Sequence, residues 1–117
     1  MPAQSSNPAV GAPLPRAAEA HMTDEKLRWI LAEHGHGQEW ARVFQVGEND
    51  ANLLWNAIER AAVAAPVSRV VSRGEHGIVC GVSFALTLNQ RTGLVTTAWH
   101  YAKHGDAPRL VTAYPSL

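Results

Sequence analysis

The pattern of hydrophobic and polar positions changes at Pro66 and divides the chain into two halves. Before Pro66, apolar residues recur three and four positions apart, which is the spacing of amphipathic α-helices. After it, apolar and polar residues alternate, which is the spacing of β-strands. Helices followed by an antiparallel meander predict an α+β fold. We expect two or three N-terminal helices packed on one face of a three- to four-stranded antiparallel sheet.

Three helices are predicted, and local signals define their bounds. The first begins at Thr23, a good N-cap, and ends before the glycines at positions 35 and 37. The second covers residues 38–45. The third, capped by Asn49 or Asp50, reaches Ala64 before Pro66 stops it.

Four strands are predicted, at residues 67–73, 77–88, 94–101 and 109–114. The first is a short edge strand, and Pro115 ends the last. Residues 89–93 form a hairpin turn, and residues 103–108 lead the chain into the final strand. Since the helices cover one face of the sheet, the other face is left open to solvent or to a ligand.

The final strand carries two hydroxyl groups next to each other. Alternation places Leu110, Thr112 and Tyr114 on one face, and Arg109, Val111 and Ala113 on the other. Two hydroxyls on one strand face are common. The pattern therefore indicates a possible site and leaves its chemistry open.

Composition describes one domain with an N-terminal extension. Residues 1–22 are rich in Ala, Pro, Ser and Gly and predict a flexible leader or linker, so that residues 23–117 form the domain. The single cysteine, Cys80, excludes an internal disulfide and lies in an apolar strand, where a small core residue is expected. No apolar run approaches the roughly 20 residues of a membrane span, and the N-terminus has no secretory h-region. We therefore expect no membrane anchoring.

Charge is balanced over the chain but not along it. Residues 1–59 hold four Lys/Arg and eight Asp/Glu, a net charge of −4. Residues 60–117 hold six Lys/Arg and two Asp/Glu, a net charge of +4. A basic half gives weak support for a polyanionic partner, since the same asymmetry arises by chance in short chains.

The segment Pro108 to Pro115 reads PRLVTAYP. It resembles the C-terminal signature of an uncharacterised bacterial domain family linked to polymorphic toxins. The TAYP ending also resembles the RNase A-like toxins of contact-dependent inhibition and, more loosely, the barnase–EndoU–colicin–RelE ribonucleases. A partial second match runs from Lys26 and Leu27 through His34, Gly37 and Phe44. Trp40 stands where that family has a lysine.

The resemblance implies a toxin domain that cleaves RNA without a metal or cofactor, by attack of the 2′-hydroxyl on phosphorus to give a 2′,3′-cyclic phosphate. It implies His34 as acid or base, and Thr112 and Tyr114 as donors to phosphate oxygens. Arg42 or Lys26 would supply the positive charge in place of the missing lysine. His34 is an equally good helix C-terminal residue, and His36 is expected to be solvated between its glycines.

Three further residues are candidate substrate-binding groups: Thr97, Trp99 and Arg109. Trp99 could stack on a nucleobase, although a strand Trp is more often a core residue. Arg109 could hold a phosphate only if the strand bulges, because alternation places it opposite Thr112. No phosphate-binding glycine loop, GxSxG motif or cysteine zinc spacing is present, so no metal site is expected.

The resemblance also implies partners and a place of action. Its RNA substrate would be tRNA, mRNA or ribosomal RNA, in the bacterial cytoplasm, after delivery from a secreted parent protein. An acidic immunity protein would cover the open face. The rival interpretations are a non-enzymatic module that binds a protein on the sheet and a toxin with another nucleotide-directed activity.

Overall fold

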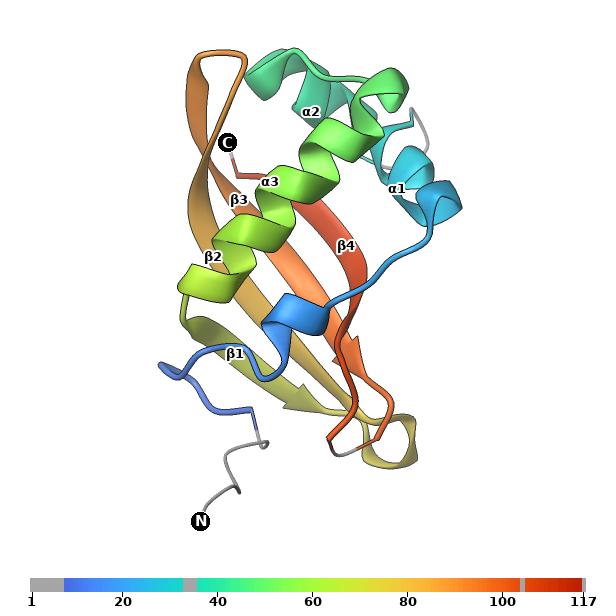
Figure 1. The fold of residues 1–117 in the computed structure, drawn as a ribbon, viewed down its shortest axis with the longest axis vertical. Coiled ribbons are helices and arrows are strands. Elements are labelled where there is room, and N and C mark those ends of the chain that lie inside the picture. Colours follow the sequence, from blue (N-terminus) through green and yellow to red (C-terminus); the bar gives the residue numbers. More distant parts are fainter. Residues whose placement is uncertain (1–7, 33–35, 104, 117) are drawn as a thin grey trace.

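The computed structural model describes residues 8–32, 36–103 and 105–116 and confirms the predicted α+β fold. Three helices pack on a four-stranded antiparallel sheet whose strands follow one another in the order β1-β2-β3-β4 (Figure 1). The helices are α1 (Asp24–Leu31), α2 (Gly37–Phe44) and α3 (Ala51–Ala64). The strands are β1 (Val67–Ser72), β2 (Ile78–Leu88), β3 (Arg91–Tyr101) and β4 (Arg109–Pro115). Three short 3-10 helices are η2 (Ala17–Glu19), η3 (Glu48–Asp50) and η4 (Gly74–His76).

The helix starts follow the capping signals of the sequence. The Thr23 side chain accepts a hydrogen bond from the backbone N–H of Lys26 at 3.1 Å, which confirms its predicted role as the N-cap of α1. Asp50, one of the two predicted caps, stands at the N-cap position of α3 but makes no side-chain hydrogen bond to that helix. Its carboxylate accepts a hydrogen bond from the Gly47 N–H at 2.9 Å.

The β2–β3 hairpin is tighter than predicted. Its turn consists of Asn89 and Gln90, with φ of 52° and 63°, so that β3 starts at Arg91 and not at the expected residue 94. Positive φ at both central residues matches the right-handed twist of the strands, which favours such two-residue turns. The Asn89 side chain also donates to the carbonyl of Phe44 at 2.9 Å and so ties the turn to α2.

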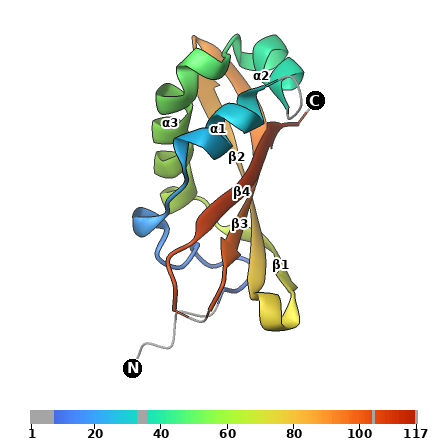
Figure 2. The same cartoon turned by 90° about the vertical axis from the view of Figure 1, so that its right-hand side faces the viewer.

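All three helices lie on one side of the sheet, and no helix in the described part of the chain covers the other side (Figure 2). The covered face holds the core, whose largest fully buried side chains are Trp40, Trp99 and Phe44. Cys80 is buried there as well, which confirms its interpretation as a core residue. We call the uncovered side the open face.

A β-bulge in β4 corrects the predicted faces of that strand. Thr112 pairs with Ala98, but the next pair is Leu110 with Trp99, so that Val111 is an extra residue on the β4 side. As a result, Leu110 and Ala113 are buried on the covered face, whereas Thr112 and Tyr114 lie on the open face. The prediction that Leu110 shares a face with Thr112 is therefore wrong.

Residues 11–21 are packed against the sheet, in contrast to the flexible leader predicted for residues 1–22. Backbone hydrogen bonds join Gly11 and Ala12 to Val67 in β1. Others join His21 to Pro108 and Leu110, on either side of Arg109 at the start of β4. Leu14 is 3% exposed because it is part of the core. This segment therefore contacts both outer strands of the sheet.

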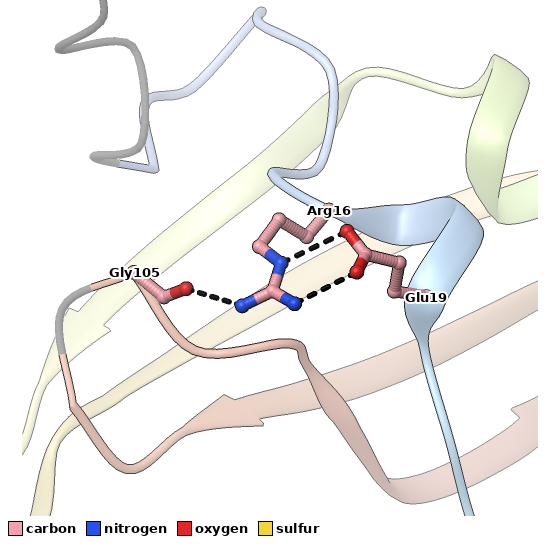
Figure 3. A network of polar contacts seen from close by, with 3 residues as sticks. All are labelled: Arg16, Glu19 and Gly105. Carbon is pink, nitrogen blue, oxygen red and sulfur yellow. Dashed lines mark hydrogen bonds and ion pairs between the residues drawn. The ribbon is translucent and has the colours of Figure 1, made fainter.

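Arg16 fixes the middle of that segment. Its guanidinium pairs with both carboxylate oxygens of Glu19, at 2.9 and 2.8 Å, and donates to the carbonyl of Gly105 at 2.6 Å (Figure 3). Nearby, the buried Tyr101 hydroxyl donates to the carbonyl of Pro15 at 2.6 Å. The segment is thus tied to β3 and to the loop between β3 and β4.

Among the residues that the structure describes, no helix is both long enough and apolar enough to cross a membrane.

Candidate functional site

The open face is organised in register rows, because directly paired residues of antiparallel strands point to the same side. One row runs across all four strands as Arg69, Gly81, Ala98 and Thr112. The row therefore has a cation on one outer strand, a hydroxyl on the other, and two of the smallest residues between them.

The next row adds more hydroxyl groups. Ser83, Thr96 and Tyr114 are paired across β2, β3 and β4. The Thr96 hydroxyl lies 3.2 Å from that of Ser83 and 3.3 Å from that of Ser116, so the three form a hydrogen-bonded chain. Such hydroxyls can donate to or accept from a polar ligand.

The small residues of the first row leave a hollow of about 250 Å³ on the open face. Thr112 and Tyr114 line one side of it, and Arg69 and Arg73 line the other. The hollow is lined in addition by Ser68, Val71, Val79, Gly81, Thr96, Thr97 and Ala98. No described carboxylate lines it, so it is suited to an anionic ligand.

Tyr114 is in contact with a histidine from the helical layer. The rings of His36 and Tyr114 are tilted by 37° with their centroids 5.0 Å apart, and Nδ1 of His36 lies 3.5 Å from a carboxylate oxygen of Glu39. The side chain of His36 is 34% exposed. An accessible imidazole beside a carboxylate and set against a phenol is placed as a general acid or base would be.

Close packing between α1 and α2 positions His36 at the edge of β4. The backbone N–H of His36 donates to the carbonyl of Ile30 at 2.9 Å. The next residue must be Gly37, since a Cβ there would lie 2.5 Å from the carbonyl oxygen of Leu31. The buried indole of Trp40 then donates to the carbonyl of Ala113 at 3.1 Å, which holds α2 against β4.

Glu39 is held in its charged form. A hydrogen bond from its own backbone N–H lowers the pKa of Glu39, and the neighbouring His36 and Arg42 lower this pKa further. The carboxylate therefore stays negative beside the imidazole.

Two of the predicted substrate-binding residues are core residues. Thr97 and Trp99 are both 0% exposed on the covered face, and the Trp99 indole donates to the Thr97 hydroxyl at 2.8 Å. Neither side chain can reach a ligand on the open face. The prediction that Trp99 flanks the site is wrong, and the expectation that a strand Trp is usually core holds for it. Thr97 does adjoin the hollow, but its hydroxyl bonds to Val82 and Trp99 in the core, so the prediction that it binds substrate is wrong.

Arg109 is on the open face because of the bulge. It pairs with His100. Strict alternation without the bulge would have placed it on the face of the sheet opposite to that of Thr112. It lies one row beyond Arg69 and Thr112 and is exposed, but it does not line their hollow.

The remaining predicted residues are spread over the molecule. Lys26 is half-buried on α1, with its ammonium 5.4 Å from the ring centre of Trp29, and it lines a separate hollow with Arg109. Arg42 is exposed in the last turn of α2. His34 lies outside the described residues. The structure therefore places Thr112 and Tyr114 along one hollow and brings Tyr114 into contact with His36, a residue that was expected to be solvated.

The sequence analysis also missed Arg69 and Arg73. A signal was available, because these residues alternate with Val71 in a predicted edge strand and so share a face. For His36 no comparable signal exists, since its contact with Tyr114 depends on tertiary packing. In the described part of the chain, no group of three or more His, Cys, Asp or Glu side chains is placed to hold a metal ion.

The chain belongs to the family described as Domain of unknown function (DUF6883), which it matches over residues 13–117. The match includes residues 13–21 of the N-terminal segment that packs on the sheet, as well as the helices and strands. A search of curated proteins and of solved structures finds no match.

Proposed function

We propose that this domain is a metal-independent ribonuclease whose reaction takes place at Tyr114, Thr112 and His36. The observation that carries the proposal is the contact between the rings of His36 and Tyr114 at the rim of an open, hydroxyl-rich face. A proton-transfer group thus lies next to donors that can hold a phosphate.

RNA supplies its own nucleophile, so the protein needs only to move a proton and stabilise charge. In the proposed reaction, His36 takes the proton of the 2′-hydroxyl, and the 2′-oxygen bonds to the adjacent phosphorus. The bond from phosphorus to the 5′-oxygen breaks, and the imidazolium returns its proton to that oxygen. The products are a 2′,3′-cyclic phosphate and a free 5′-hydroxyl.

Thr112 and Tyr114 donate hydrogen bonds to the phosphate oxygens, on which negative charge increases during the attack. Donors fixed by a strand need little reorganisation at that moment, which is why such groups contribute strongly to catalysis. Glu39, whose carboxylate oxygen lies 3.5 Å from Nδ1 of His36, keeps the imidazole oriented.

The biological role proposed with this reaction is that of a toxin domain acting in the bacterial cytoplasm, delivered from a secreted parent protein. The neutralising partner would be an acidic immunity protein that covers the open face. Toxicity on expression, relieved by the product of a neighbouring gene, is the expected result. Harmless expression of an active ribonuclease would contradict the toxin role alone.

The direct experiment is incubation of the purified domain with total RNA in EDTA. We expect cleavage with 2′,3′-cyclic phosphate ends, detected by mass spectrometry. His36→Ala should reduce the rate by about 100-fold or more, as removal of a general base does. Thr112→Val and Tyr114→Phe should each reduce it by about 100-fold, by analogy with loss of one donor to a developing oxyanion.

His76→Ala is the matched control, because this exposed histidine belongs to η4, away from the helices. It should cleave RNA at the wild-type rate. Intact RNA with the wild-type protein would refute the proposal. Cleavage lost in His34→Ala and retained in His36→Ala would move the proton transfer to His34.

A further inference from the structure

We infer that the Arg69 side of the hollow binds a second phosphate of the same single-stranded nucleic acid, next to the phosphate held at Tyr114 and Thr112 on its other side. This inference rests on the proposed function and assigns a substrate-binding role to Arg69 and Arg73, with Gly81 and Ala98 as the floor beneath the chain of the substrate.

The register row from Arg69 to Thr112 spans the whole width of the sheet. Four neighbouring strands stand about 4.8 Å apart, so the backbones of Arg69 and Thr112 are separated by roughly 14 Å. The row is long enough for more than one phosphate to lie along it. A polynucleotide lying across the strands can place one phosphate at each end.

The β1 side of the hollow is positively charged. Arg69 and Arg73 are exposed, line the same hollow and form no ion pair with any residue that the structure describes. A guanidinium presents a planar fork of donors that matches phosphate oxygens. Two such groups above a surface without carboxylates favour an anion over a neutral ligand.

The small residues Gly81 and Ala98, in the middle of the row, leave room for a ligand next to the sheet. A glycine inside a strand weakens it and often marks a place where a ligand approaches the backbone. A Cβ at Gly81 would lie 3.3 Å from the Cβ of Arg69 and 3.8 Å from the hydroxyl oxygen of Ser68. Any larger side chain there would displace Arg69 and fill the hollow.

A β-bulge adjoins each end of this row. The extra residue of β1 is Ser68, next to Arg69, and the extra residue of β4 is Val111, next to Thr112. Each bulge turns the following side chain onto the open face. Bulges are frequent beside binding sites, where they re-aim a side chain in this way.

The experiment measures binding without cleavage. A fluorescent single-stranded oligo-deoxythymidine has no 2′-hydroxyl and cannot undergo the proposed reaction. Its affinity for the full chain is measured by anisotropy at several salt concentrations. Arg69→Gln should weaken binding by about 10-fold or more, and the slope of log affinity against log salt should become shallower by about 0.7.

Arg60→Gln is the matched control, since this exposed arginine lies on α3 on the other side of the sheet, and it should bind like the wild type. Gly81→Val fills the space between the ends of the row and displaces Arg69, whereas Ala98→Val fills it without a change next to Arg69, and both should weaken binding. Ala98→Val keeps this test valid if Gly81→Val does not fold, because Val is a favourable strand residue.

Wild-type binding that does not depend on Arg69, or no binding at all, would overturn the inference. Tighter binding of poly-glutamate than of the oligonucleotide would also overturn it, in favour of an acidic protein partner. Arg69-dependent binding without any RNA cleavage would support the subsite and remove the proposed ribonuclease. RNA cleavage together with Arg69-independent binding would reject the subsite alone.

Discussion

Replacing Thr97 with Val tests whether this residue is structural, as its position on the covered face indicates. Val has nearly the shape of Thr but lacks the hydroxyl. In the wild type that hydroxyl donates to the carbonyl of Val82 at 2.8 Å and accepts from the indole N–H of Trp99 at 2.8 Å. Thr97 and Trp99 are both 0% exposed, so water cannot replace the lost partner.

The expected cost follows from these two bonds. A buried indole N–H left without an acceptor costs about 1–3 kcal/mol, and loss of the hydrogen bond from the hydroxyl to Val82 adds about 0.5–1.5 kcal/mol. Thr97→Val should therefore lower the free energy of unfolding by about 2–4 kcal/mol. With a urea slope of about 2 kcal/mol per molar, the midpoint of unfolding should fall by about 1–2 M.

Thr112→Val is the matched control, because it makes the same chemical change on the open face. It should alter the free energy of unfolding by less than about 0.5 kcal/mol, as surface substitutions usually do. Urea unfolding followed by far-ultraviolet circular dichroism measures both variants. The activity pattern should be reversed, with RNA cleavage reduced in Thr112→Val and retained by folded Thr97→Val. A fall of less than 0.5 kcal/mol in Thr97→Val would contradict the buried network.

Three further predictions concern strain, reactivity and pH. Gly77→Ala should destabilise the fold by about 1–3 kcal/mol or more in urea unfolding, because Gly77 has a φ of 90° and a Cβ would overlap the carbonyl of Tyr101. Gly74 has a φ of 58° but open space around it, so Gly74→Ala should lower the free energy of unfolding by less. Equal losses of stability in the two variants would show that the overlap is unimportant. Burial raises the pKa of Cys80 to about 11, so about one thiol in a thousand is ionised at pH 8, and iodoacetamide should label the native protein far more slowly than the unfolded one. Burial also raises the pKa of Tyr101. The unfolded chain therefore loses both protons at lower pH than the folded protein, and the urea midpoint should fall as pH rises above about 9. The fall should be less steep in Cys80→Ala, and a midpoint that stays constant up to about pH 11 would contradict this prediction.

The helices and strands could be predicted because local signals and tertiary packing agree in them. The cap at Thr23, the stop at Pro66 and the alternation in residues 78–88 each define a unit that the fold uses unchanged. The turn at Asn89 was placed correctly but was expected to be longer, because sequence spacing does not distinguish a two-residue turn from a five-residue one.

The candidate site was predicted only in part, because two bulges break the period on which the prediction depends. One extra residue reverses the faces on either side of it, and alternation alone cannot locate that residue. Thr112 and Tyr114 could be singled out from their motif, but their true neighbours could not. His36 reaches Tyr114 only through the packing of α1 against α2, and nothing in its flanking glycines indicates that contact.

The segment of residues 11–21 also has a consequence for how the domain can be produced. It pairs with β1 at one margin of the sheet and with β4 at the other, and it buries Leu14 between them. Unpaired strand margins invite pairing with another molecule. A truncated protein beginning at Thr23 would leave both margins bare, so we expect it to self-associate or precipitate where the full chain stays monodisperse.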